Sequence, residues 1–458
     1  MRNVEIERVR DRVDVISQLP DCILHHILSF IPTKDVVKTS ILSKRWNNLW
    51  TSVPNLDFDD ALLYASEMDG CRDPPEVACF MNFVERVLLL RDTPNMEKFR
   101  LSCRVCFNSS RIHSWISVAI MHNAHELDLC LFAEDPFVLP RSMFSSGSLT
   151  ILKIEMNCIL ELPNSVCLPY LKSLHLSLVT FMDDESTQKL FSGCRVLEEL
   201  VMLDCEWMNL KNITISSSTL KHLTIDDLPY FGPPDAPSGC KITIDTPNLA
   251  YLNYTGYLSN EILLYDVSSL IKAYISVPIP NDRQKEVAFH VIGLLKGLRN
   301  VASLRVSNRT IESLVLAGNM LVHLPVFRNL ARLELSMEIG NPTVGSLMKL
   351  LDCCPKLQSL YIIEGFGHDV CLVETDLIWS LLHKCTSFCL KMLTFKNFHG
   401  HDSEIRFLNY FLQRRLVSER IDICCCENLS GDPNRQKEVR NELETIAKGC
   451  ASCVVTFS

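Results

Sequence analysis

Two cysteines at a Cys-x-x-Cys spacing, Cys103 and Cys106, are residues of this chain whose types and spacing suggest chemistry. Such a pair can supply half of a zinc site or act as a redox dithiol. No second pair follows at the roughly 15–20 residues that separate the pairs of many zinc sites. Both cysteines also come directly after an apolar stretch with the pattern of a strand. We therefore interpret them as thiols packed beside a strand.

Other cysteines and histidines are also close together near the C-terminus. Cys424, Cys425 and Cys426 adjoin a predicted strand, so their thiols cannot all reach one ion without distorting the backbone. His399 and His401 lie in the turn FHGHDSE, which can bind a metal, but we favour a solvated loop. We expect no metal and no cofactor.

The usual enzyme motifs are missing from the sequence. It contains no G-x-x-x-x-G-K-[ST], no H-E-x-x-H and no G-x-S-x-G, the patterns of phosphate loops, zinc proteases and serine nucleophiles. Gly365-Phe-Gly367 lacks the third glycine of a dinucleotide-binding turn. The chain is therefore predicted to be non-catalytic.

Length and composition bound the class of protein. The chain has 458 residues, of which 47% are apolar and 22% charged, so it is globular. A net charge of −9 argues against nucleic-acid binding, which needs basic surfaces. The many cysteines scatter through a long chain, which indicates free thiols in a reducing compartment. With no apolar signal segment and no run of 18 apolar residues, we expect an intracellular protein of the nucleus or cytoplasm, without a membrane contact.

The stretch from Ser17 to Trp50 has apolar residues at helical spacing in three short bursts. Pro20 and Pro32 mark the start and the end of the first burst, Thr33 can cap the second, and Ser43 can cap the third. Three short helices of this size cannot bury so many large side chains among themselves. The surplus apolar surface packs either on the rest of the chain or on a partner, and we favour a partner.

The string LPDCILHHILSFIPTKDVVKTSILSKRWNNLW resembles the F-box of plant F-box proteins, with Cys22 where an acidic or small residue is more usual. The resemblance implies binding to a Skp-type adaptor and, through it, to a cullin. It assigns five residues to the adaptor contact and two more to its support or extension. The five are Leu19, Pro20, Ile23, Ile27 and Leu28, and the two are Ile41 and Trp46.

An apolar-x-x-apolar-x-apolar pattern recurs through most of the chain, with starts separated by 21 to 33 residues. This spacing brackets the leucine-rich-repeat period, in which each copy is a strand followed by a return segment, here predicted helical. The copies begin at Met96, Ala124, Leu149, Leu171, Leu197, Leu220, Leu249, Leu270, Val301, Leu330, Leu357 and Leu390. The copy Leu270-Ala273-Ile275 is weak, but bounded spacing argues against chance.

Two other segments flank the repeats. Residues 55–95 are predicted as a connector, with Asp57, Asp59 and Asp60 in turns or loops and a capping helix that carries Phe80 and Val84. Residues 385–458 read strand, helix, strand, helix, strand. This layout, with CLKMLTFKNFHG and the final VVTFS, resembles the FBD region of plant F-box/leucine-rich-repeat proteins, and it would cap the last repeat.

The side chains beside the buried positions of each repeat strand are expected on the concave face of the repeats. From the seventh repeat on they include tyrosine and arginine, the residue types enriched in binding hot spots, although solvation alone also explains them. The speculative target-binding residues are Tyr251, Tyr274, Arg305, Arg332 and Tyr361.

The sequence thus predicts an α/β solenoid: an all-α F-box (13–54), the connector (55–95), an irregular leucine-rich-repeat horseshoe (96–384) and an α+β FBD-like cap (385–458). The resemblance implies a substrate-recruiting subunit of an SCF-type ubiquitin ligase that binds an unknown target protein. Three alternatives remain open: a scaffold outside any ligase, a small-molecule-sensing F-box receptor and a secreted repeat domain.

Overall fold

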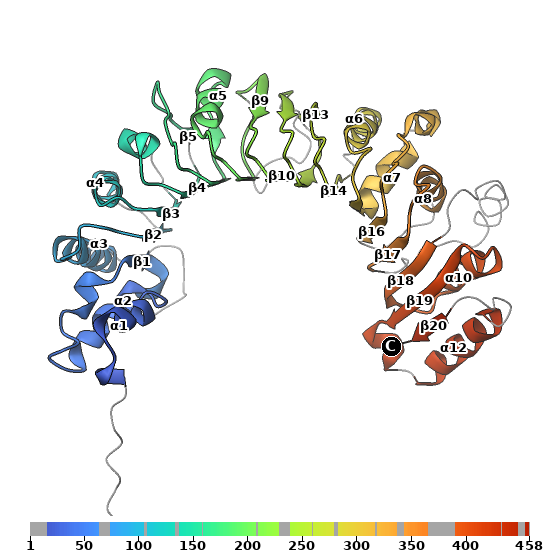
Figure 1. The fold of residues 1–458 in the computed structure, drawn as a ribbon, viewed down its shortest axis with the longest axis horizontal. Coiled ribbons are helices and arrows are strands. Elements are labelled where there is room, and N and C mark those ends of the chain that lie inside the picture. Colours follow the sequence, from blue (N-terminus) through green and yellow to red (C-terminus); the bar gives the residue numbers. More distant parts are fainter. Residues whose placement is uncertain are drawn as a thin grey trace, which may run out of the picture. The chain divides into compact units, whose positions relative to one another are not determined.

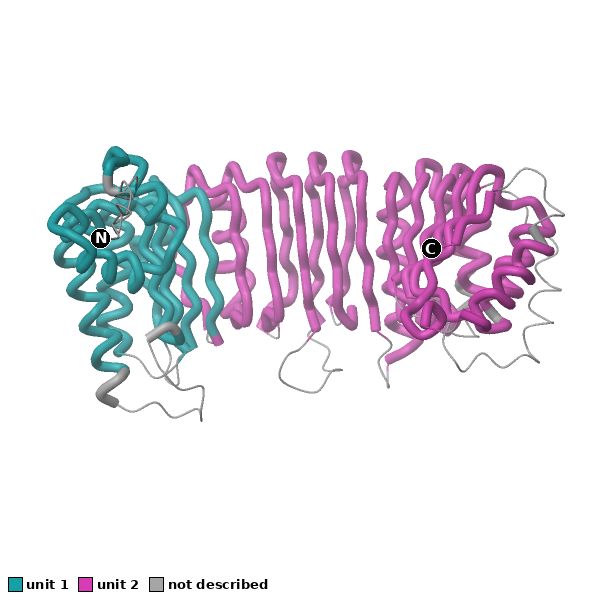
Figure 2. The backbone as a smooth tube through the Cα atoms, turned by 90° about the horizontal axis from the view of Figure 1, so that it is seen from below, with its two compact units in different colours: residues 1–156 teal, residues 157–458 magenta. Residues whose placement is uncertain are grey.

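The computed structural model divides into two compact units, residues 1–156 and residues 157–458 (Figure 2). The structure describes residues 16–63, 74–104, 108–132, 137–157, 159–207, 209–228, 239–258, 260–278, 283–316, 318–336, 343–364, 390–431, 433–447 and 454–457. Cys106, Gly365 and Gly367, interpreted above, lie outside the described residues. None of the described helices has the length and apolar content that crossing a membrane requires.

The first unit begins with short helices (Figure 1). These are η1 (Ile16–Gln18), α1 (Asp21–Leu28), α2 (Thr33–Lys38), η2 (Thr39–Ile41) and η3 (Leu49–Ser52). The third helix expected after Ser43 is not a regular α-helix. The amide of Trp46 donates to the Ser43 carbonyl at 3.1 Å, so the chain forms tight three-residue turns there and then η3.

These helices have an apolar core of their own. Leu24, Leu28, Val36, Trp46, Leu49 and Val53 are buried together, and Leu19 and Trp50 pack against them. Hydrogen bonds connect the helices to the strand that follows. For example, the Thr33 hydroxyl accepts from the Asp57 amide at 2.7 Å, and Asn55 Nδ2 donates to the Ser29 carbonyl. The helical region is thus a filled small domain anchored within the first unit.

The rest of the first unit is a parallel sheet with helices. Its strands, in spatial order, are β1 (Asn55–Asp59), β2 (Lys98–Cys103), β3 (Glu126–Leu131) and β4 (Ile151–Met156). Its other elements are η4 (Asp60–Leu63), α3 (Pro74–Leu89), α4 (Ser109–Met121) and η5 (Arg141–Ser145). The prediction of a loop at Asp57 and Asp59 is wrong. Both residues lie in β1, where they alternate with the buried side chains of Leu56 and Phe58.

The second unit contains the longer run of repeats. Its parallel strands lie in the order β6 (Ser173–Ser177), β8 (Glu199–Leu203), β10 (His222–Asp227), β12 (Tyr251–Gly256), β14 (Lys272–Ser276), β15 (Ser303–Ser307), β16 (Arg332–Ser336) and β17 (Ser359–Ile362). Every predicted repeat start in this unit precedes one of these strands or β18, the weak Leu270 copy included. The repeat prediction is therefore confirmed.

The return segments differ along the second unit. Helices α5 (Asp184–Gly193), α6 (Gln284–Gly297), α7 (Asn308–Leu316) and α8 (Thr343–Asp352) lie on one side of the sheet, as Figure 1 shows, with η6 (Gly318–His323) after α7. The prediction of a helical return segment is wrong for the middle repeats. There β9 (Asn212–Ser216), β11 (Lys241–Asp245) and β13 (Glu261–Leu264) form a second parallel sheet, because NITIS and KITID alternate apolar and polar residues. Two short strands, β5 (Ile159–Leu160) and β7 (Thr180–Phe181), also pair.

The C-terminal region has the predicted alternation of strands and helices. It consists of β18 (Leu390–Phe398), α10 (Asp402–Gln413), β19 (Val417–Cys425), the short α11 (Glu427–Ser430), α12 (Pro433–Ala447) and β20 (Val454–Phe457). The strand β18 pairs with β17, and β19 and β20 follow in order. Phe395, Phe407 and Phe411 are fully buried between this sheet and α10. The region therefore continues the repeat sheet with its own core.

Candidate functional site

Helix α1 presents two kinds of apolar side chain. Leu24 and Leu28, one helical turn apart, are 0% and 2% exposed and belong to the core. Ile23 and Ile27 occupy the adjacent row and are 44% and 46% exposed. Neighbouring residues extend this exposed apolar set, which we define as Ile23, Ile27, Phe30, Ile31, Ile41 and Leu42. Because the core is already filled, these side chains are available to a partner.

The residues assigned to the adaptor contact divide between surface and core. Pro20, Ile23, Ile27 and Ile41 are exposed. Leu19 is half-buried against the core of the helices. Leu28 and Trp46 are buried, so they shape the helices from inside and do not present a surface. The i, i+4 spacing alone could not show which of two adjacent rows of apolar residues on α1 faces inward. Phe30 and Leu42 are also exposed, although the sequence did not single them out for the adaptor contact.

A second candidate site lies on the face of the second-unit sheet that points away from the helices, here called the open face. A cavity of about 740 Å³ is lined there by Tyr251, Asn253, Lys272, Ala273, Tyr274, Ser303, Arg305, Arg332 and Glu334. Four of the five predicted target-binding residues are in this lining. The fifth, Tyr361, lies outside it but packs under Arg332, whose Cζ is 3.9 Å from the ring centroid.

Strand register explains why these residues meet. Tyr274 on β14 is the lateral partner of Arg305 on β15, and Arg305 is the partner of Glu334 on β16. The Arg305 guanidinium lies over the Tyr274 ring at 5.1 Å. Lys272 and Glu334, not predicted as hot spots, line the same cavity because they occupy the same alternating positions of their strands. The period-2 alternation of strand residues is the sequence signal that could have identified Lys272 and Glu334.

Three carboxylates gather at the ends of β8 and β10 in the same unit. Burial raises the pKa of Asp204, and the charge of Asp226 raises it further. Burial also raises the pKa of Asp226. It raises the pKa of Asp227 to about 7, against the opposing effect of a hydrogen bond from Asn260 Nδ2 at 3.1 Å. None of these three carboxylates lines the open-face cavity.

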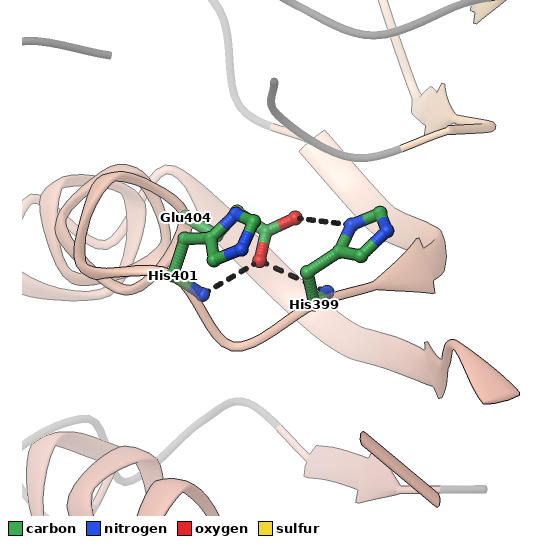
Figure 3. Close-up of side chains that lie close together, drawn as sticks. All are labelled: His399, His401 and Glu404. Atoms are coloured by element: carbon green, nitrogen blue, oxygen red, sulfur yellow. Dashed lines mark hydrogen bonds and ion pairs between the residues drawn. The ribbon is translucent and has the colours of Figure 1, made fainter. Parts of the chain in front are cut away.

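His399, His401 and Glu404 form a group whose ligand-type atoms all lie within 4.8 Å of one another (Figure 3). One Glu404 oxygen accepts from the backbone amides of His399 and His401, both at 3.0 Å. The other oxygen is 3.7 Å from His399 Nδ1. The two imidazole rings are stacked with 6° between their planes. Imidazole binds a metal in its ring plane, so parallel rings do not point at one ion, and we interpret Glu404 as a cap for α10.

Replacing Glu404 with alanine is expected to lower the free energy of unfolding by about 2–4 kcal/mol, because two partly buried amides lose a charged acceptor. Thermal unfolding of the full chain measures this loss. Glu404→Gln keeps one acceptor oxygen and should lose less. A chelator should leave the wild-type midpoint unchanged. A midpoint that falls with EDTA and recovers with zinc would contradict the capping role.

Three family models match this sequence, and their matches agree with the architecture. The F-box domain model matches residues 16–58, and the FBD model matches residues 380–414. A model described as FBD-associated F-box protein At5g56370, LRR repeats, matches residues 112–258. The three matches follow the order F-box, repeats and FBD region along the chain.

Whole proteins of Arabidopsis thaliana are also similar. F-box protein At3g59000 is 33% identical over 451 residues, covering 91% of this chain and 87% of that protein. F-box/LRR-repeat protein At3g59210 is 31% identical over 462 residues, covering 95% and 92%. Putative F-box/FBD/LRR-repeat protein At3g59240 is 32% identical over 423 residues, covering 87% and 81%. This chain belongs to the plant F-box/FBD/leucine-rich-repeat family.

Members of this F-box/FBD/leucine-rich-repeat family are typically non-catalytic. Burial raises the pKa of Cys194 and of Cys240 to about 12 each, so neither is a thiolate at neutral pH. Cys103 is buried at the end of β2, which agrees with the packing interpretation. None of the described cysteines forms a disulfide.

Proposed function

We propose that this chain is the substrate-recruiting F-box subunit of an SCF-type cullin-RING ubiquitin ligase. The observation that carries the proposal is the exposed apolar set on an F-box whose own core is filled. Large aliphatic side chains in water on a completed small domain are typical of a surface that a partner covers. The F-box implies a Skp-type adaptor as that partner, and a cullin binds through the adaptor.

The repeats supply the second interaction in this proposal. A target protein binds the open face around the cavity between β12 and β16. The assembly then holds target lysines near a ubiquitin-charged enzyme, which raises the effective concentration of the reacting groups. The chemistry belongs to the ligase partners, and the working compartment is the nucleus or the cytoplasm. We retain residues 13–54, 55–95, 96–384 and 385–458 as the proposed divisions of the chain.

Proximity labelling under proteasome inhibition tests this function. The full chain is compared with the double variant Ile23→Asp/Ile27→Asp, which leaves the open face unchanged. Wild type should recover adaptor and cullin and should increase the ubiquitin conjugates of its labelled neighbours. The variant should label the same target without those partners or conjugates. A scaffold outside any ligase would be favoured if wild type recovered neither adaptor nor cullin and its neighbours carried no more ubiquitin conjugates than with the variant.

A further inference from the structure

The cations on the sheet strands differ in whether a carboxylate contacts them. In the first unit, Lys98 and Arg100 each contact a carboxylate at 2.8 Å. In the second unit, Arg332 forms an ion pair with Glu334. Lys272 and Arg305 lie between these cases in sequence, and no described carboxylate is within ion-pair distance of either. Two exposed cations in one cavity therefore form no ion pair, and the one carboxylate in the lining, Glu334, contacts Arg332 instead.

The cavity is basic although the chain as a whole is acidic. Lys272, Arg305 and Arg332 oppose the single carboxylate of Glu334, whereas the net charge of the chain is −9. Like charges placed together repel each other unless an anion offsets them. Lys272 pairs laterally with Ser303, two residues before Arg305, so the two unpaired cations are diagonal neighbours on adjacent strands.

The position of Arg305 leaves its donors available. Its Cζ lies 5.1 Å from the centroid of the Tyr274 ring, so the flat face of the guanidinium packs on the ring. The N–H donors of a guanidinium lie in its plane and can still form a bidentate contact with a carboxylate or phosphate. Arg305 is exposed, whereas Tyr274 beneath it is half-buried. The ring thus positions a cation without neutralising it.

The cavity lining also argues against an apolar small molecule. Pockets for such ligands are lined mainly by hydrophobic and aromatic side chains. Here Ala273 is the one aliphatic residue among the lining side chains. The hydroxyls of Tyr251 and Ser303 and the amide of Asn253 add polar groups beside the cations. This composition suits an extended peptide with anionic side chains.

We propose that the open-face cavity binds an acidic peptide segment of the target protein, with Arg305 and Lys272 as its charge-recognising residues. This inference rests on the proposed function, since it names the class of target segment that the F-box subunit recruits. The anionic groups are carboxylates or phosphates, which the same donors recognise. Arg332, already paired with Glu334, positions the rim of the site through its contact with Tyr361.

The test uses the full chain and fluorescein-labelled decapeptides, with binding measured by fluorescence anisotropy. One peptide contains alternating glutamate and glycine, a second has phosphoserine in place of glutamate, and a third has neutral serine. The two anionic peptides are compared to identify the preferred source of charge. Binding of either one, weakened as salt rises and absent for the serine peptide, supports the proposal.

Variants locate the binding. Arg305→Glu/Lys272→Glu should weaken the anionic peptide at least tenfold. The control is Lys241→Glu, an exposed lysine on β11 in the second sheet, which should change affinity less than twofold. The inference is overturned if neither anionic peptide binds the wild-type protein, including the case in which inorganic phosphate binds but the peptides do not. It is also overturned if the control variant and the double variant weaken peptide binding equally. Adaptor binding is measured in parallel, so that wild-type protein that binds the adaptor but neither anionic peptide rejects this inference and leaves the proposed function standing.

Discussion

Replacing Ile23 and Ile27 together with aspartate is expected to weaken binding of the Skp-type adaptor by about 100-fold or more. Each isoleucine is nearly half exposed on α1, and covering the two would contribute roughly 1–3 kcal/mol apiece. Aspartate at either position also adds the cost of removing a charge from water. Because a tenfold change in affinity corresponds to about 1.4 kcal/mol, these effects together reach at least 100-fold.

The measurement is a titration of purified adaptor against the full chain. Leu89→Asp serves as the matched control, because Leu89 ends α3 outside the F-box and is 83% exposed. It introduces one aspartate at an exposed leucine, against two aspartates in the double variant, and should leave adaptor affinity unchanged. The double variant should unfold at the wild-type temperature, since neither isoleucine belongs to the core. Wild-type affinity in the double variant would show that α1 does not contact the adaptor.

Replacing Trp46 with alanine is expected to destabilise the F-box by about 3–5 kcal/mol, because a large buried side chain leaves a cavity among Leu24, Leu28 and Leu49. Trp46 is 6% exposed and does not belong to the exposed apolar set. Loss of this much stability should open the helices and weaken adaptor binding indirectly. Trp50→Ala, which removes a half-buried tryptophan packed on the same core, should have a smaller effect.

Hydrogen exchange of the F-box amides distinguishes the two roles. Trp46→Ala should lose protection across α1 and α2 and lose adaptor affinity with it. The Ile23→Asp/Ile27→Asp variant should lose affinity with protection intact. If Trp46→Ala kept full protection and still lost the adaptor, Trp46 would contact the adaptor directly, as the family resemblance first suggested. The buried position of the indole would then have to change on binding.

Most of the fold could be predicted from the sequence because repetition makes a weak local signal strong. A single copy such as Leu270-Ala273-Ile275 proves little, but its place in a series of bounded spacing identified β14. The strand β1 was missed because it contains only one clear apolar pair, Leu56 and Phe58, between aspartates. Asp57 and Asp59 face Arg100 on the neighbouring strand, and that pairing is a tertiary contact.

The candidate site could be predicted only in part. Tyrosine and arginine on alternating strand positions identified the open face, and four of the five chosen residues line one cavity. The sequence could not show that Lys272 and Arg305 lack carboxylate partners while Arg332 has one. Ion pairing between strands depends on register, and register between repeats of unequal length follows from how the intervening segments pack.

By itself the sequence determined the class of the protein: an F-box, a leucine-rich-repeat solenoid and an FBD region, since each depends on local apolar spacing and motif. Only the tertiary structure decided which apolar residues of the F-box remain in water. Ile23 and Leu24 are adjacent on one short helix, yet Ile23 is 44% exposed and Leu24 is fully buried. The reason is physical: a stripe of apolar residues fixes a face of the helix, but the packing of Trp46 and Val36 against α1 determines which half of that face is covered.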